Sequence, residues 1–126
     1  MKVFKTRWFA RFARQEKIAD GGLREAIERA ERGLVDADLG GGLIKQRVAR
    51  QGQGRSGGYR VMIAYRAANK AFFLHGFAKS GQENIGEDEL SALRKFGRRL
   101  LTADAETLNG MFEDGSLKEI EDDKEE

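Results

Sequence analysis

A run of basic residues in the middle of the chain is the feature most able to do chemistry. Between residues 43 and 80 every charged side chain is basic, and these residues are Lys45, Arg47, Arg50, Arg55, Arg60, Arg66, Lys70 and Lys79. Arginine holds phosphate oxygens through two parallel hydrogen bonds and keeps its proton at any physiological pH. Such an array favours a polyanion, usually nucleic acid, as its ligand. The alternative is a solvated face that the acidic end of the chain balances in the fold.

RNA cleavage by transesterification is a reaction that this array could support. The attacking group is the 2′-OH of the RNA itself, so the protein needs no nucleophile. It needs cations that stabilise the additional negative charge of the transition state. It also needs a general base and a general acid, for which the candidates are His75, Tyr65, Lys79 and Lys45.

Several of these side chains also have a packing interpretation. His75 lies in an apolar segment, and simple alternation places Phe73 and Phe77 on its face of the strand. Tyr65 shares a face with Val61 and Ile63, as a core tyrosine would. Trp8, Phe9 and Phe12 stand at helical spacing and are expected in the core. Arg60 is different, because it alternates outward in a strand that Gly57 and Gly58 precede.

Other site classes lack the residues that they need. The sequence contains no Cys and a single His, which excludes disulfides, thiolate metal sites and cysteine nucleophiles and argues against a histidine-built metal site. The glycine-rich stretch 52–58 matches neither phosphate-loop spacing and is expected to join two strands as a loop. We therefore expect neither a metal nor a cofactor.

The elements that must position these residues follow from the hydrophobic pattern. Helices are predicted from a cap at Thr6, from a cap at Asp20, and over 86–101 and 104–113. Strands are predicted at 3–4, 43–49, 59–66, 70–77 and 117–120. The fold class is α+β, with an N-terminal helical hairpin packed on a small antiparallel sheet and with C-terminal helices. One face of that sheet is expected to pack on helices and the other to be more polar.

The size and charge of the chain indicate a single domain with an uneven distribution of charge. The chain has 126 residues, of which 40% are hydrophobic and 35% charged, and this composition fits one folded domain over residues 1–120 with an acidic, frayed tail over 121–126. Residues 1–80 carry a net charge of +10 and residues 81–126 a net charge of −8, which gives the overall +2. No signal peptide or membrane-spanning run stands out, and the absence of Cys suits a reducing compartment, so we expect a cytoplasmic protein without a membrane partner.

Two consecutive segments resemble the RelE/ParE superfamily of bacterial toxins, and most closely its HigB-like RelE branch. They are Gly58-Tyr59-Arg60-Val61-Met62-Ile63-Ala64-Tyr65-Arg66 and Phe72-Phe73-Leu74-His75-Gly76-Phe77-Ala78-Lys79. The order of elements fits as well, and the resemblance covers roughly residues 1 to 120. It implies a toxin of a type II toxin–antitoxin system that cleaves mRNA on the ribosome without a metal, inhibits translation and is neutralised by a cognate antitoxin.

The resemblance also implies roles for individual residues. Arg60 matches the strand arginine that contacts the scissile phosphate, Lys45 and Arg47 match basic positions of the preceding strand, and Lys79 matches a basic residue that closes the last strand. Ser80 stands where RelE has a second basic residue, and no tyrosine stands over 84–87 to match the C-terminal catalytic tyrosine of RelE. The general acid and base therefore stay open.

The predicted site has two groups of residues. Arg60, Lys79, His75 and Lys45 are the catalytic candidates, and Arg47, Arg50, Arg55 and Arg66 are the RNA- and phosphate-binding candidates. The competing hypothesis is a protein without nuclease activity. It would be either a toxin of the ParE kind that acts on DNA gyrase or a module that binds only its antitoxin or RNA.

Overall fold

The chain folds as an α+β domain, which confirms the predicted fold class. The computed structural model describes residues 1–50, 54–67, 69–79 and 85–120, of which 54–57 and 66–67 are described by their backbone alone. In chain order the elements are β1 (Lys2–Thr6), α1 (Arg7–Glu16), α2 (Asp20–Glu31), β2 (Ala37–Gly40), β3 (Leu43–Arg50), β4 (Gly54–Ala67), β5 (Lys70–Ala78), α3 (Glu87–Thr102), α4 (Ala105–Glu113) and β6 (Leu117–Ile120). The predicted acidic tail, 121–126, lies outside the described residues.

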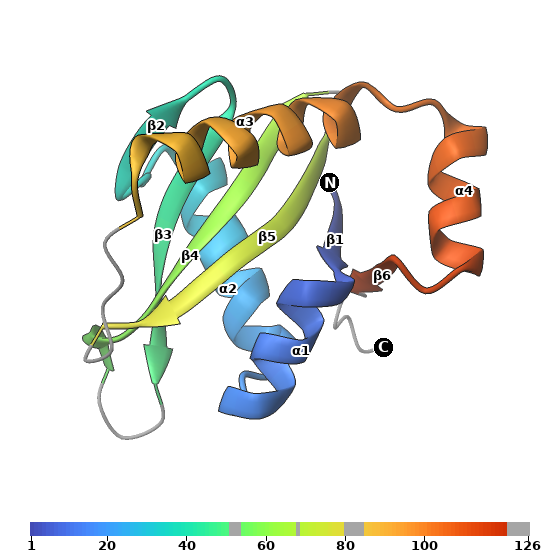
Figure 1. Ribbon diagram of the computed structural model, residues 1–126. Helices are drawn as coiled ribbons and strands as arrows, with labels where there is room; N and C mark the ends of the chain where they lie inside the picture. The colour runs from blue at the N-terminus through green and yellow to red at the C-terminus, as the bar shows by residue number, and fades with distance from the viewer. Residues whose placement is uncertain (51–53, 68, 80–84, 121–126) are drawn as a thin grey trace.

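The strands form one sheet in the order β2-β3-β4-β5-β1-β6 (Figure 1). The central meander of β3, β4 and β5 is antiparallel, as the short connections predict. The sheet as a whole is mixed, because β1 inserts beside β5 in the parallel direction with Val3 opposite Ala71. The prediction of a purely antiparallel sheet was therefore wrong for the pair of β1 and β5. The partner of β1 stands almost seventy residues away in the sequence, and alternation within a strand carries no information about such a partner.

One additional strand and one strand boundary also differ from the sequence pattern. The four-residue strand β2 was not predicted, since Ala37–Gly40 is too short to show an alternation. Strand β4 begins at Gly54 and includes part of the glycine-rich stretch that was predicted to be a loop. Backbone pairing decides both cases, because β2 pairs with β3 and Gly54 pairs with Arg50 across the β3–β4 ladder. Glycine offers no side chain from which a strand period could be read.

Helices α1 and α2 cover one side of the sheet, which we call the closed face. Thr6 caps α1 as predicted, its hydroxyl accepting a hydrogen bond from the backbone N–H of Phe9 at 3.2 Å. Phe9 packs on Phe73 with ring centroids 5.1 Å apart. The cluster on this side consists of buried residues from both helices and from every long strand, among them Leu23, Ile27, Val48, Val61 and Ile63. This continuous apolar layer supports the sheet on its closed face.

Helix α3 covers part of the opposite side. Leu100 and Leu101 pack with Leu43 and Phe72 beneath the C-terminal half of the helix. Gly97 brings the helix axis close to the sheet, since a Cβ atom at this position would lie 2.9 Å from the Cβ of Ala64. Figure 1 shows α3 crossing β3, β4 and β5 near one end of these strands. The sheet surface beyond α3 is the open face, and it carries the site described below.

Trp8 departs from its predicted place in the core. Its side chain is 60% exposed, whereas Phe9 is 1% exposed. The Trp8 ring meets the Phe96 ring of α3 edge to face, with centroids 6.0 Å apart. A helix buries one stripe, and adjacent residues point about 100° apart. The sequence marks both aromatics as apolar but does not say which of them faces the sheet.

The sequence analysis predicted no membrane-spanning segment, and the helices of the structure can be compared with that prediction. Among the described residues, no helix combines the length and the apolar character that crossing a membrane requires.

Candidate functional site

Strand register brings the predicted basic residues into two neighbouring rows on the open face. Lys45 is opposite Met62, which is opposite His75, and this gives the first row. Arg47 is opposite Arg60, which is opposite Phe77, and this gives the second. Directly opposed residues have Cβ atoms about 4.5–5.5 Å apart, and diagonal neighbours lie about 7–8 Å apart. Lys45, Arg47, Arg60 and His75 therefore belong to one compact surface.

Lys79 extends this surface at the end of β5. It is exposed, and its backbone N–H donates to the carbonyl of Gly58 at 2.9 Å. It follows Phe77 by two positions, so the strand period places it next to the row that contains Arg60. Four predicted cations and one imidazole thus come together, although they are up to 34 residues apart in the sequence.

A β-bulge decides where His75 points. Met62 pairs with His75 while the next residue, Ile63, pairs with Phe73, so Leu74 is the extra residue. Phe73 consequently packs on the closed face, and His75 shares the open face with Phe77, their ring centroids being 6.1 Å apart. The prediction that Phe73 and His75 share a face was wrong. The bulge turns His75 away from the closed-face core and toward the basic residues.

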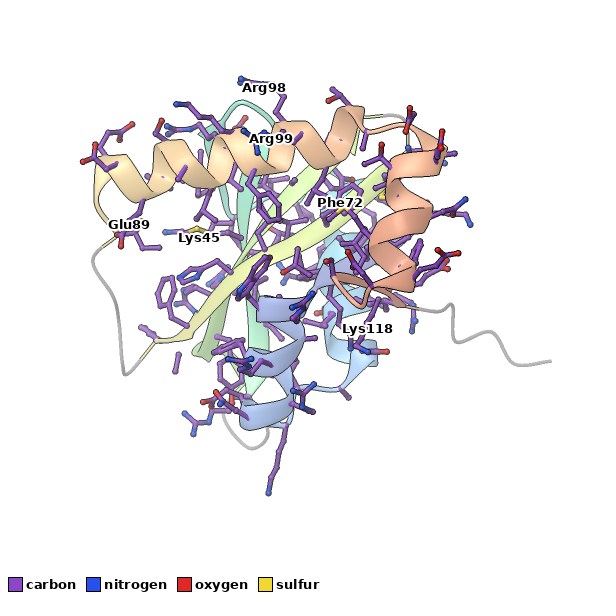
Figure 2. All side chains as sticks on the ribbon, turned by 45° about the vertical axis from the view of Figure 1, so that its right-hand side comes forward. Lys45, Phe72, Glu89, Arg98, Arg99 and Lys118 are labelled. Carbon is purple, nitrogen blue, oxygen red and sulfur yellow. The ribbon has the colours of Figure 1, made fainter. Side chains whose placement is uncertain are left out.

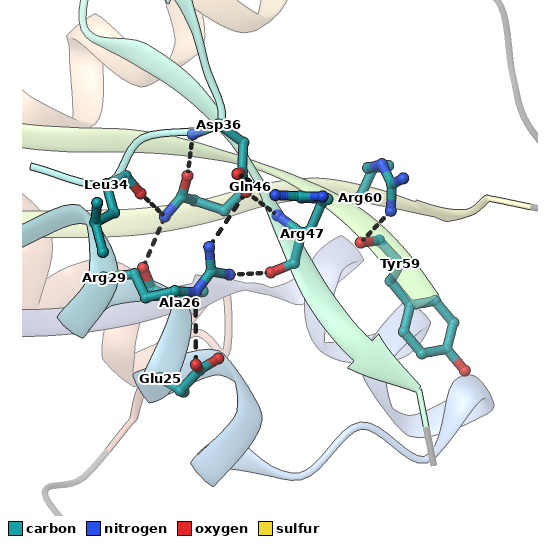
Figure 3. Close-up of polar contacts among 9 residues, drawn as sticks. All are labelled: Glu25, Ala26, Arg29, Leu34, Asp36, Gln46, Arg47, Tyr59 and Arg60. Carbon is teal, nitrogen blue, oxygen red and sulfur yellow. Dashed lines mark hydrogen bonds and ion pairs between the residues drawn. The ribbon is translucent and has the colours of Figure 1, made fainter. Parts of the chain in front are cut away.

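Asp36 fixes Arg47 at the edge of this surface (Figure 3). The Arg47 guanidinium donates to Asp36 Oδ1 at 3.1 Å, and the Arg47 backbone N–H donates to Asp36 Oδ2 at 2.7 Å. Arg29, buried in α2, donates to the same Oδ2 at 3.3 Å and also to the Arg47 carbonyl. One carboxylate therefore connects a buried arginine with an arginine that is 44% exposed.

The pKa of Asp36 reports this arrangement. Burial alone would raise it, but hydrogen bonds from the backbone and side chain of Arg47 and from Arg29 outweigh burial, so the pKa of Asp36 lies below the ordinary aspartate value. Asp36 is consequently ionised at neutral pH and remains a fixed anchor for both guanidinium groups. An arginine held in this way loses little side-chain entropy when it binds an anion.

Gln46 supports the same corner from below. It is fully buried between the strand and α2, where its amide donates to the carbonyls of Ala26 at 3.0 Å and Leu34 at 3.2 Å. Its carbonyl accepts the backbone N–H of Asp36 at 2.7 Å. This buried amide therefore sets the height of Asp36 relative to β3. The sequence analysis missed Asp36, Gln46 and Arg29, although a glutamine between the inward-facing Ile44 and Val48 was a visible signal.

Arg60 lies at the centre of the open face. Its side chain is half-buried, and its Nη1 donates to the carbonyl of Tyr59 at 3.4 Å. Arg60 and Arg47 are a directly opposed cross-strand pair, and like charges in this relationship repel each other. Asp36 compensates the charge of Arg47 from the outer side of the pair (Figure 3). An anion placed above both guanidinium groups would remove the repulsion and accept several charge-assisted hydrogen bonds.

Two further predicted residues, Arg50 and Tyr65, do not join this group. Arg50 lies over the ring of Tyr59, 5.6 Å from its centroid, and Tyr59 packs on the closed face. Burial, with a hydrogen bond to Glu16, raises the pKa of Tyr59. Tyr65 packs against the closed-face core, as its alternation with Ile63 predicts. Arg55 and Arg66 belong to β4, but their side chains lie outside the described part of the structure.

The first turns of α3 add acidic groups beside the open face. Glu87, Asp88 and Glu89 begin the helix, where carboxylates suit its dipole. Figure 2 shows Lys45 and Glu89 near this end of α3, with Arg98 and Arg99 farther along it. The helix thus changes sign along its length, and its acidic end is the one nearest Lys45.

The described part of the chain has no cluster of metal-ligating side chains. Within it, no three His, Cys, Asp or Glu side chains are grouped closely enough to hold a metal ion.

Comparison with known proteins gives one result. A family model described as the RelE toxin of the RelE/RelB toxin–antitoxin system matches residues 1–120. No curated protein matches the chain.

Proposed function

Because the chain belongs to the RelE toxin family, we propose that it is an mRNA endoribonuclease that cleaves messages on the ribosome. It is a toxin of a toxin–antitoxin system, and its cognate partner is an antitoxin protein. The nuclease activity, the ribosome as the place of action, the bacterial cytoplasm and the HigB-like branch belong to the proposal. The observation that carries it is the opposed pair of Arg47 and Arg60 with Lys45, His75 and Lys79 around it.

The two arginines suit the scissile phosphate. In the transition state the phosphorus carries five oxygens and extra negative charge, and two adjacent guanidinium groups can donate to its non-bridging oxygens. Arg47 is already oriented by Asp36, and Arg60 lies one strand further into the sheet. Lys79 at the end of β5 is placed to bind a neighbouring phosphate of the same strand.

Lys45 and His75 suit the two proton transfers. They flank Met62 in one row, so two strand spacings of about 4.8 Å separate their backbones. The attacking and leaving oxygens of an in-line displacement lie on opposite sides of phosphorus. His75 accepts the proton of the 2′-OH as the bond from O2′ to phosphorus forms. Lys45 donates a proton to O5′ as the bond from phosphorus to O5′ breaks, which leaves a 2′,3′-cyclic phosphate and a 5′-hydroxyl end.

Cell-free translation with mapping of mRNA 5′ ends tests this proposal. Wild type should stop protein synthesis and create new 5′-hydroxyl ends within the coding sequence. Arg60→Gln should lower the cleavage rate about 100- to 1,000-fold, the usual loss when one transition-state donor is removed. Arg14→Gln is the matched control, since Arg14 is an exposed arginine of α1. It should cleave like wild type.

Two results would overturn the proposal. The first is an intact message in the presence of folded wild-type protein; if broken chromosomal DNA then appeared in cells expressing the toxin, gyrase would become the target. The second is cleavage by Arg60→Gln at the wild-type rate, which would remove the open face from the mechanism.

A further inference from the structure

A small cavity lies beside the open face, between β5 and the beginning of α3. Its volume is about 260 Å³, and it is lined by His75, Ile85, Glu89, Ala92 and Leu93. Pockets for drug-sized ligands usually measure about 300–1,000 Å³. This cavity is smaller, and it combines apolar walls with one imidazole and one carboxylate. We call it the α3 pocket.

The position of the α3 pocket relates it to the arginine pair. His75 forms its wall on the strand side and is the diagonal neighbour of Arg60 across the β4–β5 ladder. Such neighbours lie about 7–8 Å apart. A phosphate on Arg60 and a group in the pocket would be separated by a distance that suits the phosphate and the base of one nucleotide.

We propose that the α3 pocket receives one unpaired nucleobase of the bound RNA and prefers a base that carries an exocyclic amino group. The inference rests on the proposed function for the identity of the strand as RNA. The base stacks on the imidazole of His75, as splayed-out RNA bases do on aromatic side chains. Ile85, Ala92 and Leu93 contact its remaining surface and exclude water.

Glu89 provides the preference for an amino group. Its Oε1 accepts the backbone N–H of Gly86, the N-cap residue of α3, at 3.1 Å, and this hydrogen bond holds the carboxylate in place. A carboxylate can accept about four hydrogen bonds and donates none. The phosphates of bound RNA repel the Glu89 carboxylate unless its oxygens accept hydrogen bonds from the ligand. The amino group of cytosine, adenine or guanine supplies such a donor, whereas uracil carries a carbonyl oxygen, O4, at the position of the cytosine amino group.

Binding of 2′-deoxy trinucleotides tests the inference without any cleavage, because these probes lack the attacking hydroxyl. The trinucleotides of cytosine and of uracil are a matched pair, since their bases differ at the amino position and hardly in size. Wild type should bind the cytosine probe about tenfold more tightly in calorimetry, the effect of one charge-assisted hydrogen bond. The resonances of His75 should shift on binding.

Two variants sharpen the test. Glu89→Gln keeps an acceptor for the Gly86 N–H, because glutamine also serves at that helix position, and it should reduce the cytosine preference to less than twofold. Asp88→Asn makes the same change of charge in the same helical turn and should keep the preference. Ala92→Phe fills the pocket from an exposed position and should weaken both probes to one common affinity.

The inference is overturned if neither probe binds wild type, if Glu89→Gln keeps the preference, or if Ala92→Phe binds as wild type does. These outcomes differ from failure of the proposed function. A protein that binds the probes as described but leaves mRNA intact keeps the base pocket and loses the nuclease. A protein that cuts mRNA while Ala92→Phe cuts the same sites at the same rate keeps the nuclease and loses the pocket.

Discussion

The two sides of the central sheet differ in how deeply their side chains are buried and in the charge that they carry. On the closed face, strand side chains such as Val61 and Ile63 meet two helices and lose essentially all contact with solvent. On the open face, the residues one step along the same strand include Arg60, which stays half-buried and lies opposite another arginine. One strand thus contributes stability on one side and a binding surface on the other. The contrast shows how a domain of this size can hold like charges together, because a continuous apolar cluster on the closed face lies behind them.

The largest effect expected from this contrast concerns two aromatics that the sequence pattern treats alike. Phe73→Ala removes a ring that is fully buried on the closed face and should lower the free energy of unfolding by about 3–5 kcal/mol. Trp8→Ala removes a ring that is 60% exposed and should cost less than about 1 kcal/mol. Chemical denaturation of both variants measures the difference. Equal losses would mean that Trp8 is buried in solution and that α1 lies differently against α3.

A smaller effect is expected at Asp36, which connects the two faces. Among the described residues, Asp36→Asn leaves buried Arg29 with Glu25, 3.5 Å from its Nε, as its acidic neighbour, and it should lower the free energy of unfolding by about 1–3 kcal/mol. The pKa of Asp36 is lower in the folded state than in the unfolded chain. The stability that its charge contributes is therefore complete above the ordinary aspartate value near 3.9. It disappears as the pH falls from there through the lower, folded value.

Denaturation at a series of pH values tests that sign. Between neutral pH and the acid range, wild type should lose more stability than Asp36→Asn, so the two curves converge on acidification. Parallel curves would contradict the role of the Asp36 carboxylate. Cleavage should also slow in the variant at neutral pH, because Arg47 loses its anchor.

The sequence could predict the features that depend on residues close together in the chain. Helices and long strands follow from local periods, and Thr6 as a cap is a signal three residues long. The convergence of Lys45, Arg47 and Arg60 also follows, since alternation and a short antiparallel meander imply it.

Other features required tertiary information. The parallel pairing of β1 joins distant segments, and the bulge at Leu74 reverses the face of His75 through one unpaired residue that no local pattern marks. Asp36 reaches Arg47 only because the unpredicted strand β2 pairs with β3. Glu89 is visible in the sequence as a helix-capping acid, but its place beside His75 depends on how α3 crosses the sheet. The predicted residues therefore have local signals, whereas the contacts that position them depend on segments that are distant in the sequence.

The smallest effect expected is a gain in stability at the centre of the open face. Arg60→Gln removes one charge of the opposed arginine pair, and like-charged cross-strand neighbours destabilise a sheet by roughly 0.2–1 kcal/mol. The variant should therefore unfold at a higher denaturant concentration than wild type at low salt. Arg14→Gln, which removes an exposed charge from α1, should show no such gain. Added salt should reduce the difference in stability between wild type and Arg60→Gln, since it screens charges that remain partly exposed to solvent.

A loss of stability in Arg60→Gln would mean that Arg60 is held by favourable contacts and is not strained by its neighbour. A gain in stability together with loss of cleavage would show that the repulsion between Arg47 and Arg60 persists because a bound phosphate needs both charges.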